Sequence, residues 1–241
     1  MSCVDAAGAA ADTRFDVVWT RPAPGSDLRA YLWADQASEN DYVPDLNYQY
    51  NSTGALNTVA RLSVGTYRAT LPGIATGTDV AVMLSAYGSV ARCRVLAYGL
   101  DADQRFGVDV ECLDAAGSPA DARFTLSAFR NAPLAPLPFL NSAYLRMRNP
   151  AMPEVGPAEQ YNSAGAPNTV TRLATGRYAA RLGMMGSFGV NGNVQITAVG
   201  TGATHCKEES QVGSDADAVV TVLCFDGANP ADAEFLLTYE E

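Results

Sequence analysis

Few side chains in this sequence are suited to catalysis, and they do not combine into a catalytic set. His205 is the single histidine among 241 residues, whereas a serine or cysteine nucleophile usually needs a histidine to accept its proton. The sequence also lacks the motifs of nucleotide-binding enzymes, serine hydrolases and zinc proteases. Two carboxylates could still converge to hydrolyse a glycosidic bond, so a glycosidase-like enzyme is kept as an alternative. We expect a protein with no catalytic residues and no cofactor.

Two pairs of aspartates could bind a metal ion. They occupy matching places in the two halves of the chain, as Asp101 with Asp103 and as Asp215 with Asp217. Carboxylate oxygens are the ligands that Ca²⁺ prefers. An aspartate in a turn, however, also accepts hydrogen bonds from nearby backbone amides. We expect the turn role and keep calcium as the weaker alternative.

A polar set recurs in both halves and could form one ligand site in each. Two asparagines and an arginine keep the same spacing, as Asn51, Asn57 and Arg61 and again as Asn162, Asn168 and Arg172. Their role in the fold would be a turn capped by asparagine and serine side chains, with the arginine bonded to loop carbonyls. The functional interpretation is a polar ligand site in each copy.

Aromatic side chains gather in a short stretch of the first half, at Tyr31, Trp33, Tyr42 and Tyr48. An exposed aromatic ring stacks on the apolar face of a sugar, while neighbouring amides and carboxylates bond the sugar hydroxyls. The second half has Arg146 where the first half has Trp33. These rings are candidates for a glycan site in the first half, with burial in a hydrophobic core as the alternative.

The five cysteines form two matched pairs and a remainder: Cys93 with Cys112, Cys206 with Cys224, and Cys3. An Asp-Ala-Asp segment lies midway between the members of each pair. A hairpin that turns there would set the two cysteines opposite each other on adjacent strands, within bridging distance. We therefore predict two disulfides, which indicate an oxidising compartment. A zinc site at His205 is a weak alternative, because two thiolates and one imidazole leave zinc a ligand short.

These residues belong to a repeat, because the segment 50–62 recurs as 161–173. A second motif, Cys-x-Asp followed by glycine, begins at Cys3, Cys112 and Cys224. A proline-rich linker at 131–138 separates the copies. We predict a terminal strand pair from a truncated preceding repeat at 1–20, one repeat at 21–131 and a second at 132–241.

Apolar and polar residues alternate in short runs through both copies, as in half-buried strands. In the first copy we predict strands near 30–34, 57–63, 66–71, 80–87, 91–97 and 106–112. A closing strand ends each copy with one apolar face, at Phe15, Val17 and Trp19, at Phe124, Leu126 and Ala128, and at Phe235, Leu237 and Tyr239. The fold class is therefore all-β, with two tandem β-sandwich domains of immunoglobulin-like or jelly-roll-like type and small β-barrels as the alternative.

The closing strand at the start of the chain has no copy of its own to pack against. Its apolar stripe would be costly in water. We expect it to add to an open sheet edge of the first domain or of a neighbouring molecule. The chain would accordingly be a monomer or a strand-exchanged homo-oligomer.

The charge balance narrows the classes of partner. With 26 acidic and 16 basic residues the formal net charge is -10, so nucleic acid and anionic membranes are poor partners. We expect no membrane span and find no signal peptide at the start of this chain. The predicted disulfides favour a secreted or cell-surface location.

The segment 50–67, continued by 68–73, and the Cys-x-Asp-Ala-Ala-Gly motif resemble tandem repeats of uncharacterised secreted bacterial proteins. That resemblance covers both copies and implies extracellular β-sandwiches without an assigned activity. We expect a non-catalytic structural or adhesive module that binds a surface glycan or protein. The alternatives are the glycosidase-like enzyme and a purely structural spacer.

Overall fold

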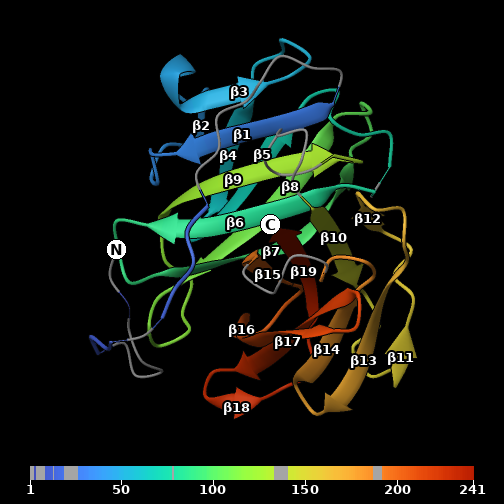
Figure 1. The fold of residues 1–241 in the computed structure, drawn as a ribbon. Helices are drawn as coiled ribbons and strands as arrows, with labels where there is room; N and C mark the ends of the chain where they lie inside the picture. The colour runs from blue at the N-terminus through green and yellow to red at the C-terminus, as the bar shows by residue number, and fades with distance from the viewer. Residues whose placement is uncertain are drawn as a thin grey trace. The chain divides into compact units, whose positions relative to one another are not determined.

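The computed structural model describes residues 3, 9–12, 14–18, 27–77, 79–132, 141–186 and 192–241 (Figure 1). Among the described residues, the regular secondary structure is almost entirely β-strand, which confirms the predicted all-β fold class. The chain divides into two compact units, and the boundary between them in the sequence lies between Arg130 and Asn131. Residues 16–18 group with the second unit, and the described residues before them group with the first. No helix of the described residues is long and apolar enough to cross a membrane.

The first unit contains two antiparallel sheets. One has four strands in the order β3-β1-β9-β6, and the other continues through β7-β8-β5-β4-β2. A short 3-10 helix, η1, precedes β3. The strand bounds are β1 Leu28–Ala34, β2 Asp41–Tyr42, β3 Gln49–Asn51, β4 Thr58–Ser63, β5 Thr66–Leu71, β6 Ala81–Tyr87, β7 Arg92–Leu100, β8 Phe106–Leu113 and β9 Arg123–Arg130, with η1 at Leu46–Tyr48.

The second unit repeats this arrangement. Its strands run β12-β10-β19-β15 in one sheet and β11-β13-β14-β17-β16 in the other, and β18 pairs with β17. Every strand of the first unit therefore has a counterpart here. In the second sheet the match appears when the strands are read in reverse, as β16-β17-β14-β13-β11 against β7-β8-β5-β4-β2. The bounds are β10 Ser142–Met147, β11 Glu154–Val155, β12 Gln160–Asn162, β13 Asn168–Ala174, β14 Arg177–Leu182, β15 Asn193–Val199, β16 Thr204–Ser214, β17 Asp217–Asp226, β18 Asn229–Pro230 and β19 Glu234–Glu240.

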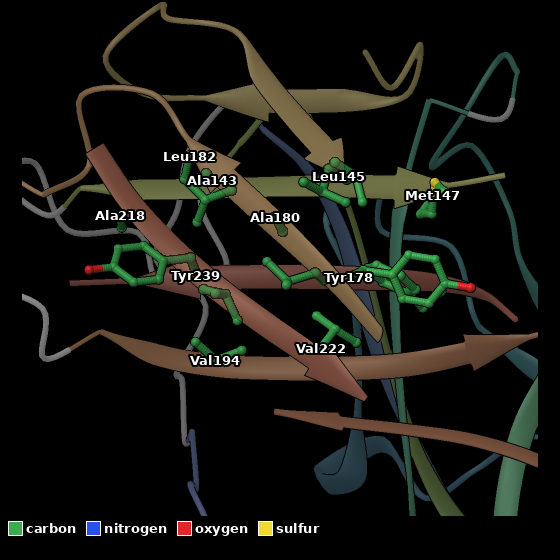
Figure 2. Close-up of a cluster of buried hydrophobic side chains, with 14 of the residues drawn as sticks. Ala143, Leu145, Met147, Tyr178, Ala180, Leu182, Val194, Ala218, Val222 and Tyr239 are labelled. Carbon is green, nitrogen blue, oxygen red and sulfur yellow. The ribbon is translucent and has the colours of Figure 1, made fainter. Parts of the chain in front are cut away.

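Alternation along the strands builds the core between the two sheets of each unit. Successive side chains of a strand point to opposite faces, and on β1 Ala30, Leu32 and Ala34 are buried while Trp33 is exposed. In the second unit, Leu145 of β10, Tyr178 of β14 and Val222 of β17 meet in one apolar cluster (Figure 2). Burial of each such side chain contributes about 1.5–3 kcal/mol to the stability of the unit.

The hairpins that carry the cysteines follow the predicted geometry. Cys93 and Cys112 are register partners on β7 and β8, and Cys206 and Cys224 are partners on β16 and β17. Both pairs form disulfides, as predicted. Cys3 has a free thiol.

The expectation for the N-terminal closing strand is wrong where it can be compared. Residues 14–18 form no strand, and Phe15 and Val17 are 59% and 57% exposed. Trp19 lies outside the described residues. Backbone carbonyls of Asp16 and Val17 accept hydrogen bonds from Gln195 and Asn193, at 3.5 Å and 3.1 Å. The closing strand at Phe124 buries the predicted face, whereas the strand at Phe235 buries that face and also Leu236, Thr238 and Glu240 of the other face.

Candidate functional site

The outer face of the β3-β1-β9-β6 sheet carries three aromatic rings in mutual contact. Trp33 of β1 stacks on Tyr48 of η1, with 5.1 Å between ring centroids, and lies 5.8 Å from the ring of Tyr87 on β6. Trp33 is 42% exposed and Tyr48 is 46% exposed. Trp33, Tyr48, Tyr87 and the adjacent Arg123 are called the aromatic face below.

Arg123 places a cation at one end of the aromatic face. It is the register partner of Tyr87 on the neighbouring strand, and its guanidinium carbon lies 5.1 Å above the Tyr87 ring centroid. Gly88, at φ +73°, leaves room for this arrangement, because a Cβ there would collide with the guanidinium. Burial raises the pKa of Tyr87, and the nearby Asp35 carboxylate raises it further. Tyr87 therefore stays a neutral phenol at physiological pH.

Hydroxyl groups lie beside the rings. The register of the sheet places Thr125 of β9 directly beside Trp33 and places Ser85 of β6 next to Thr125. Ser85 and Trp33 are both exposed. A face with apolar rings, hydroxyls and one cation is suited to a ligand with an apolar face and polar edges.

The other two aromatic candidates have no ring contact with Trp33, Tyr48 or Tyr87 among the contacts described. Tyr31 of β1 is half-buried and stacks on Tyr50 at 6.0 Å. The second unit repeats that pair as Tyr144 and Tyr161, at 5.7 Å. Tyr42 lies on β2 in the five-stranded sheet, and burial raises its pKa. The repetition of the stacked pair indicates a role in the fold for Tyr31.

The asparagine candidates hold one end of each unit together. Asn57 is fully buried, and its side-chain amide donates to the carbonyls of Tyr31 at 3.1 Å and Tyr50 at 3.0 Å. Its oxygen accepts from the Asn51 amide at 3.0 Å, and its backbone N–H donates to Gln49 Oε1 at 2.8 Å. A single side chain thus joins β1, β3 and the start of β4.

The second unit builds the same asparagine network. Asn162 donates to Asn168 at 2.9 Å, Asn168 donates to the carbonyl of Tyr161 at 3.0 Å, and the Asn168 N–H donates to Gln160 Oε1 at 2.7 Å. Asn168 is also fully buried. These polar groups are engaged inside the protein, which explains why both copies retain them without invoking a ligand.

The arginine candidates form a corner around an aspartate. Arg61 donates from Nε and Nη2 to Asp121, at 3.0 Å and 2.9 Å. Asp121 Oδ1 also accepts from the Gly65 N–H at 2.8 Å and from the Tyr67 hydroxyl at 3.2 Å. The expectation that this arginine bonds loop carbonyls is therefore wrong, because its Nε and Nη2 groups both donate to a carboxylate.

Arg172 makes the equivalent corner with Asp232 in the second unit. Its Nη2 lies 2.8 Å from Asp232 Oδ2, and Gly176 N–H and Tyr178 hydroxyl both donate to Oδ1 at 2.9 Å. The arginine side-chain hydrogen bond is the largest cause that lowers the pKa of Asp121 and of Asp232. Each carboxylate is consequently held in its charged form.

Of the calcium candidates, Asp101 has the expected turn partners, whereas the expected turn role is wrong for Asp217, which begins β17 and bonds residues far away in sequence. Asp101 accepts from the backbone N–H groups of Asp103 at 2.9 Å and Arg105 at 2.8 Å, and pairs with the Arg105 guanidinium. Those bonds, the Arg105 N–H first, lower the pKa of Asp101. Asp217 accepts from the Met184 N–H at 2.8 Å and pairs with Arg181.

Asp215 is a turn residue with φ +57°, and His205 stacks on Phe225 with 5.4 Å between ring centroids. Among the described residues, no group of three or more metal-ligating side chains comes together.

The second unit carries three charged residues and a valine where the first carries the aromatic face. The strand registers match Trp33, Tyr48, Tyr87 and Arg123 to Arg146, Glu159, Val199 and Glu234, respectively. Arg146 pairs with Glu234, and Glu159 pairs with Arg148. Arg146 is 6% exposed. The aromatic face is thus a property of the first unit alone among the described residues.

Sequence reasoning found Trp33 and Tyr48 but missed Tyr87 and Arg123. Tyr87 is the last residue of a predicted strand, and Arg123 directly precedes the predicted alternation at Phe124. Alternation places both side chains on the outer face of their strands, which was the available signal. Comparison of the chain with protein-family models, curated proteins and solved structures found no match.

Proposed function

We propose that this protein is a non-catalytic, extracellular module that binds a surface glycan through the aromatic face of its first unit. The observation that carries the proposal is the exposed pair Trp33 and Tyr48, stacked with 5.1 Å between ring centroids at the outer face of the sheet. Solvent-exposed rings in mutual contact lose little conformational entropy when a ligand stacks on them. The flanking Thr125 and Ser85 hydroxyls suit the polar edge of a sugar.

Two disulfides support the extracellular location, because such bonds persist in oxidising compartments. The second unit lacks the aromatic face, which favours a spacer role for that unit. A strand-exchanged homo-oligomer and the likeness to secreted bacterial repeats stay predictions. A glycosidase-like activity remains the rival function.

A glycan array, run beside a broad panel of glycosidase substrates, tests the proposal. We expect binding without turnover. Trp33→Ala should weaken binding by roughly 30-fold, the loss of about 2 kcal/mol that marks a binding hot spot. Turnover of any substrate would overturn the assignment, and silence on both panels would leave the spacer as the function.

A matched control separates binding from folding. Leu62 is 60% exposed and lies on β4 in the opposite sheet of the same unit, so Leu62→Ala should leave binding unchanged. Trp33→Ala removes two ring contacts and should cost only about 1–2 kcal/mol of folding free energy. A loss of 3–5 kcal/mol, as for a core aromatic, would mean that Trp33 acts in the fold.

A further inference from the structure

Arg123 lacks the carboxylate partner that most arginines in the described part of the chain possess. Eleven arginines there form ion pairs with an aspartate or glutamate. Arg123 has no such partner among the described residues, and its guanidinium lies over Tyr87 instead. In a protein with 26 acidic residues, an arginine without an internal carboxylate is available for an anion from outside.

The second unit indicates what that anion would replace. There the outer-face arginine, Arg146, pairs with Glu234, and Glu234 occupies the position that Arg123 has in the first unit. The first unit thus has Arg123 in place of Glu234 and Trp33 in place of Arg146. Its outer face carries a cation at the matched positions and no carboxylate to pair with it. An external carboxylate would complete in the first unit the charge pairing that the second unit completes internally.

On these grounds, and resting on the proposed glycan-binding function, we propose that the aromatic face selects acidic glycans, with Arg123 receiving the carboxylate of a hexuronate residue. A guanidinium presents a planar pair of donors that matches a carboxylate in a bidentate manner. The guanidinium carbon lies 5.1 Å from the Tyr87 ring centroid, within the range of a cation–π contact. Trp33 stands 5.8 Å from Tyr87, so a sugar stacked on Trp33 would lie next to the Tyr87–Arg123 pair.

Two negative features oppose an anionic ligand, and neither outweighs direct contact with Arg123. The net charge of -10 acts at long range, and ions screen interactions between exposed charges beyond about 8–10 Å at physiological ionic strength. Asp35 lies near Tyr87, but Arg123 and Asp35 form no ion pair among those described. A direct charge-assisted bond is worth roughly ten- to a hundredfold in affinity.

The test uses one hexuronate oligosaccharide in two forms, native and with its carboxyl groups reduced to primary alcohols. Calorimetry of the full chain should give at least about tenfold tighter binding of the native form. Arg123→Gln should abolish that preference while retaining binding of the reduced form through Trp33. Arg92→Gln is the matched control, because Arg92 lies on β7 in the other sheet and has no ion pair among those described.

Equal binding of the two forms by the parent protein, or a preference that survives in Arg123→Gln, would overturn the inference. A sulfated oligosaccharide without uronate distinguishes the anion, since binding as tight as that of the uronate would replace carboxylate selection by general anion capture. If neither form binds while neutral glycans on the array do, the selection of acidic sugars fails and the proposed glycan-binding function stands. If no glycan binds, both fail.

Discussion

Asp121 should be the most sensitive surface residue of the first unit. Its carboxylate accepts four hydrogen bonds, from Arg61 Nε and Nη2, from the Gly65 N–H and from the Tyr67 hydroxyl. Arg61 lies in β4, whereas Asp121 lies just before β9. The Arg61–Asp121 pair therefore joins segments that are about half the unit apart in sequence. Asp121→Ala removes every one of these bonds at once.

The size of the loss follows from what remains after the substitution. The Tyr67 hydroxyl keeps its bond to the Ala37 carbonyl at 3.0 Å, but the Gly65 N–H and the Arg61 guanidinium lose their acceptor. An unsatisfied buried donor costs about 1–3 kcal/mol, and water reaches part of Arg61. We expect a loss of about 2–4 kcal/mol. For a unit of this size that lowers the melting temperature by roughly 10–25 °C.

Acid should weaken the parent protein through the same group. The Arg61 hydrogen bond lowers the pKa of Asp121 in the folded state. The stabilisation by this carboxylate is therefore complete above the ordinary aspartate pKa of about 3.9 and is lost as the pH falls through the lower folded value. Asp121→Ala should show less of this acid-induced loss than the parent.

Thermal unfolding followed by circular dichroism and calorimetry measures both effects. Asp232→Ala should produce a loss of similar size in the second unit, since the corner there is the same. Asp41→Ala is the control, because Asp41 lies exposed on β2 and should change stability by less than about 0.5 kcal/mol. A change below about 1 kcal/mol for Asp121→Ala would refute the role of the corner.

Three further outcomes are expected. Asn57→Ala and Asn168→Ala should each lower the free energy of unfolding by about 2–4 kcal/mol, since both side chains are fully buried and make their hydrogen bonds within the protein; urea unfolding that leaves either variant at parental stability would contradict the network. Non-reducing peptide mapping should recover both disulfides, and their reduction should cost roughly 3 kcal/mol per unit; four free thiols in oxidised protein would remove the case for an extracellular home. Burial raises the pKa of Tyr67 to about 12, so the neutral phenol stabilises the fold fully below pH 10 and this stabilisation is lost between about pH 10 and 12; a titration of stability that stays flat over that range would disprove it.

Strand positions were predictable because they depend on local alternation. The expected strand near 66–71 matches β5, Thr66–Leu71, and that near 80–87 matches β6, Ala81–Tyr87. The cysteine pairing was predictable too, because two copies placed the same turn midway between their cysteines. Repetition acted as an internal check on both.

The sequence-based predictions failed in two cases. In one, an alternating segment did not form a strand, and in the other, a contact depended on the register between two strands. Phe15 and Val17 alternate as Phe124 and Leu126 do, yet they are exposed and residues 14–18 form no strand. Tyr87 and Arg123 lie 36 positions apart in sequence and become neighbours only through the β6–β9 register. No local pattern contains that register.

The pairing of first and last strands has a mechanical consequence for each unit. Leu28 is the register partner of Arg130, and Ser142 is that of Glu240, so the chain enters and leaves each unit at one end of an antiparallel pair. Tension applied through the chain acts along the interstrand hydrogen bonds, which run perpendicular to the strands, and it breaks them one after another at low force. The disulfide of the first unit then prevents the segment between its two cysteines, with a sequence separation of 19, from extending. That segment would otherwise add roughly 60–70 Å of contour length at full extension. Each unit therefore lengthens readily under load and stops short of a fully extended chain.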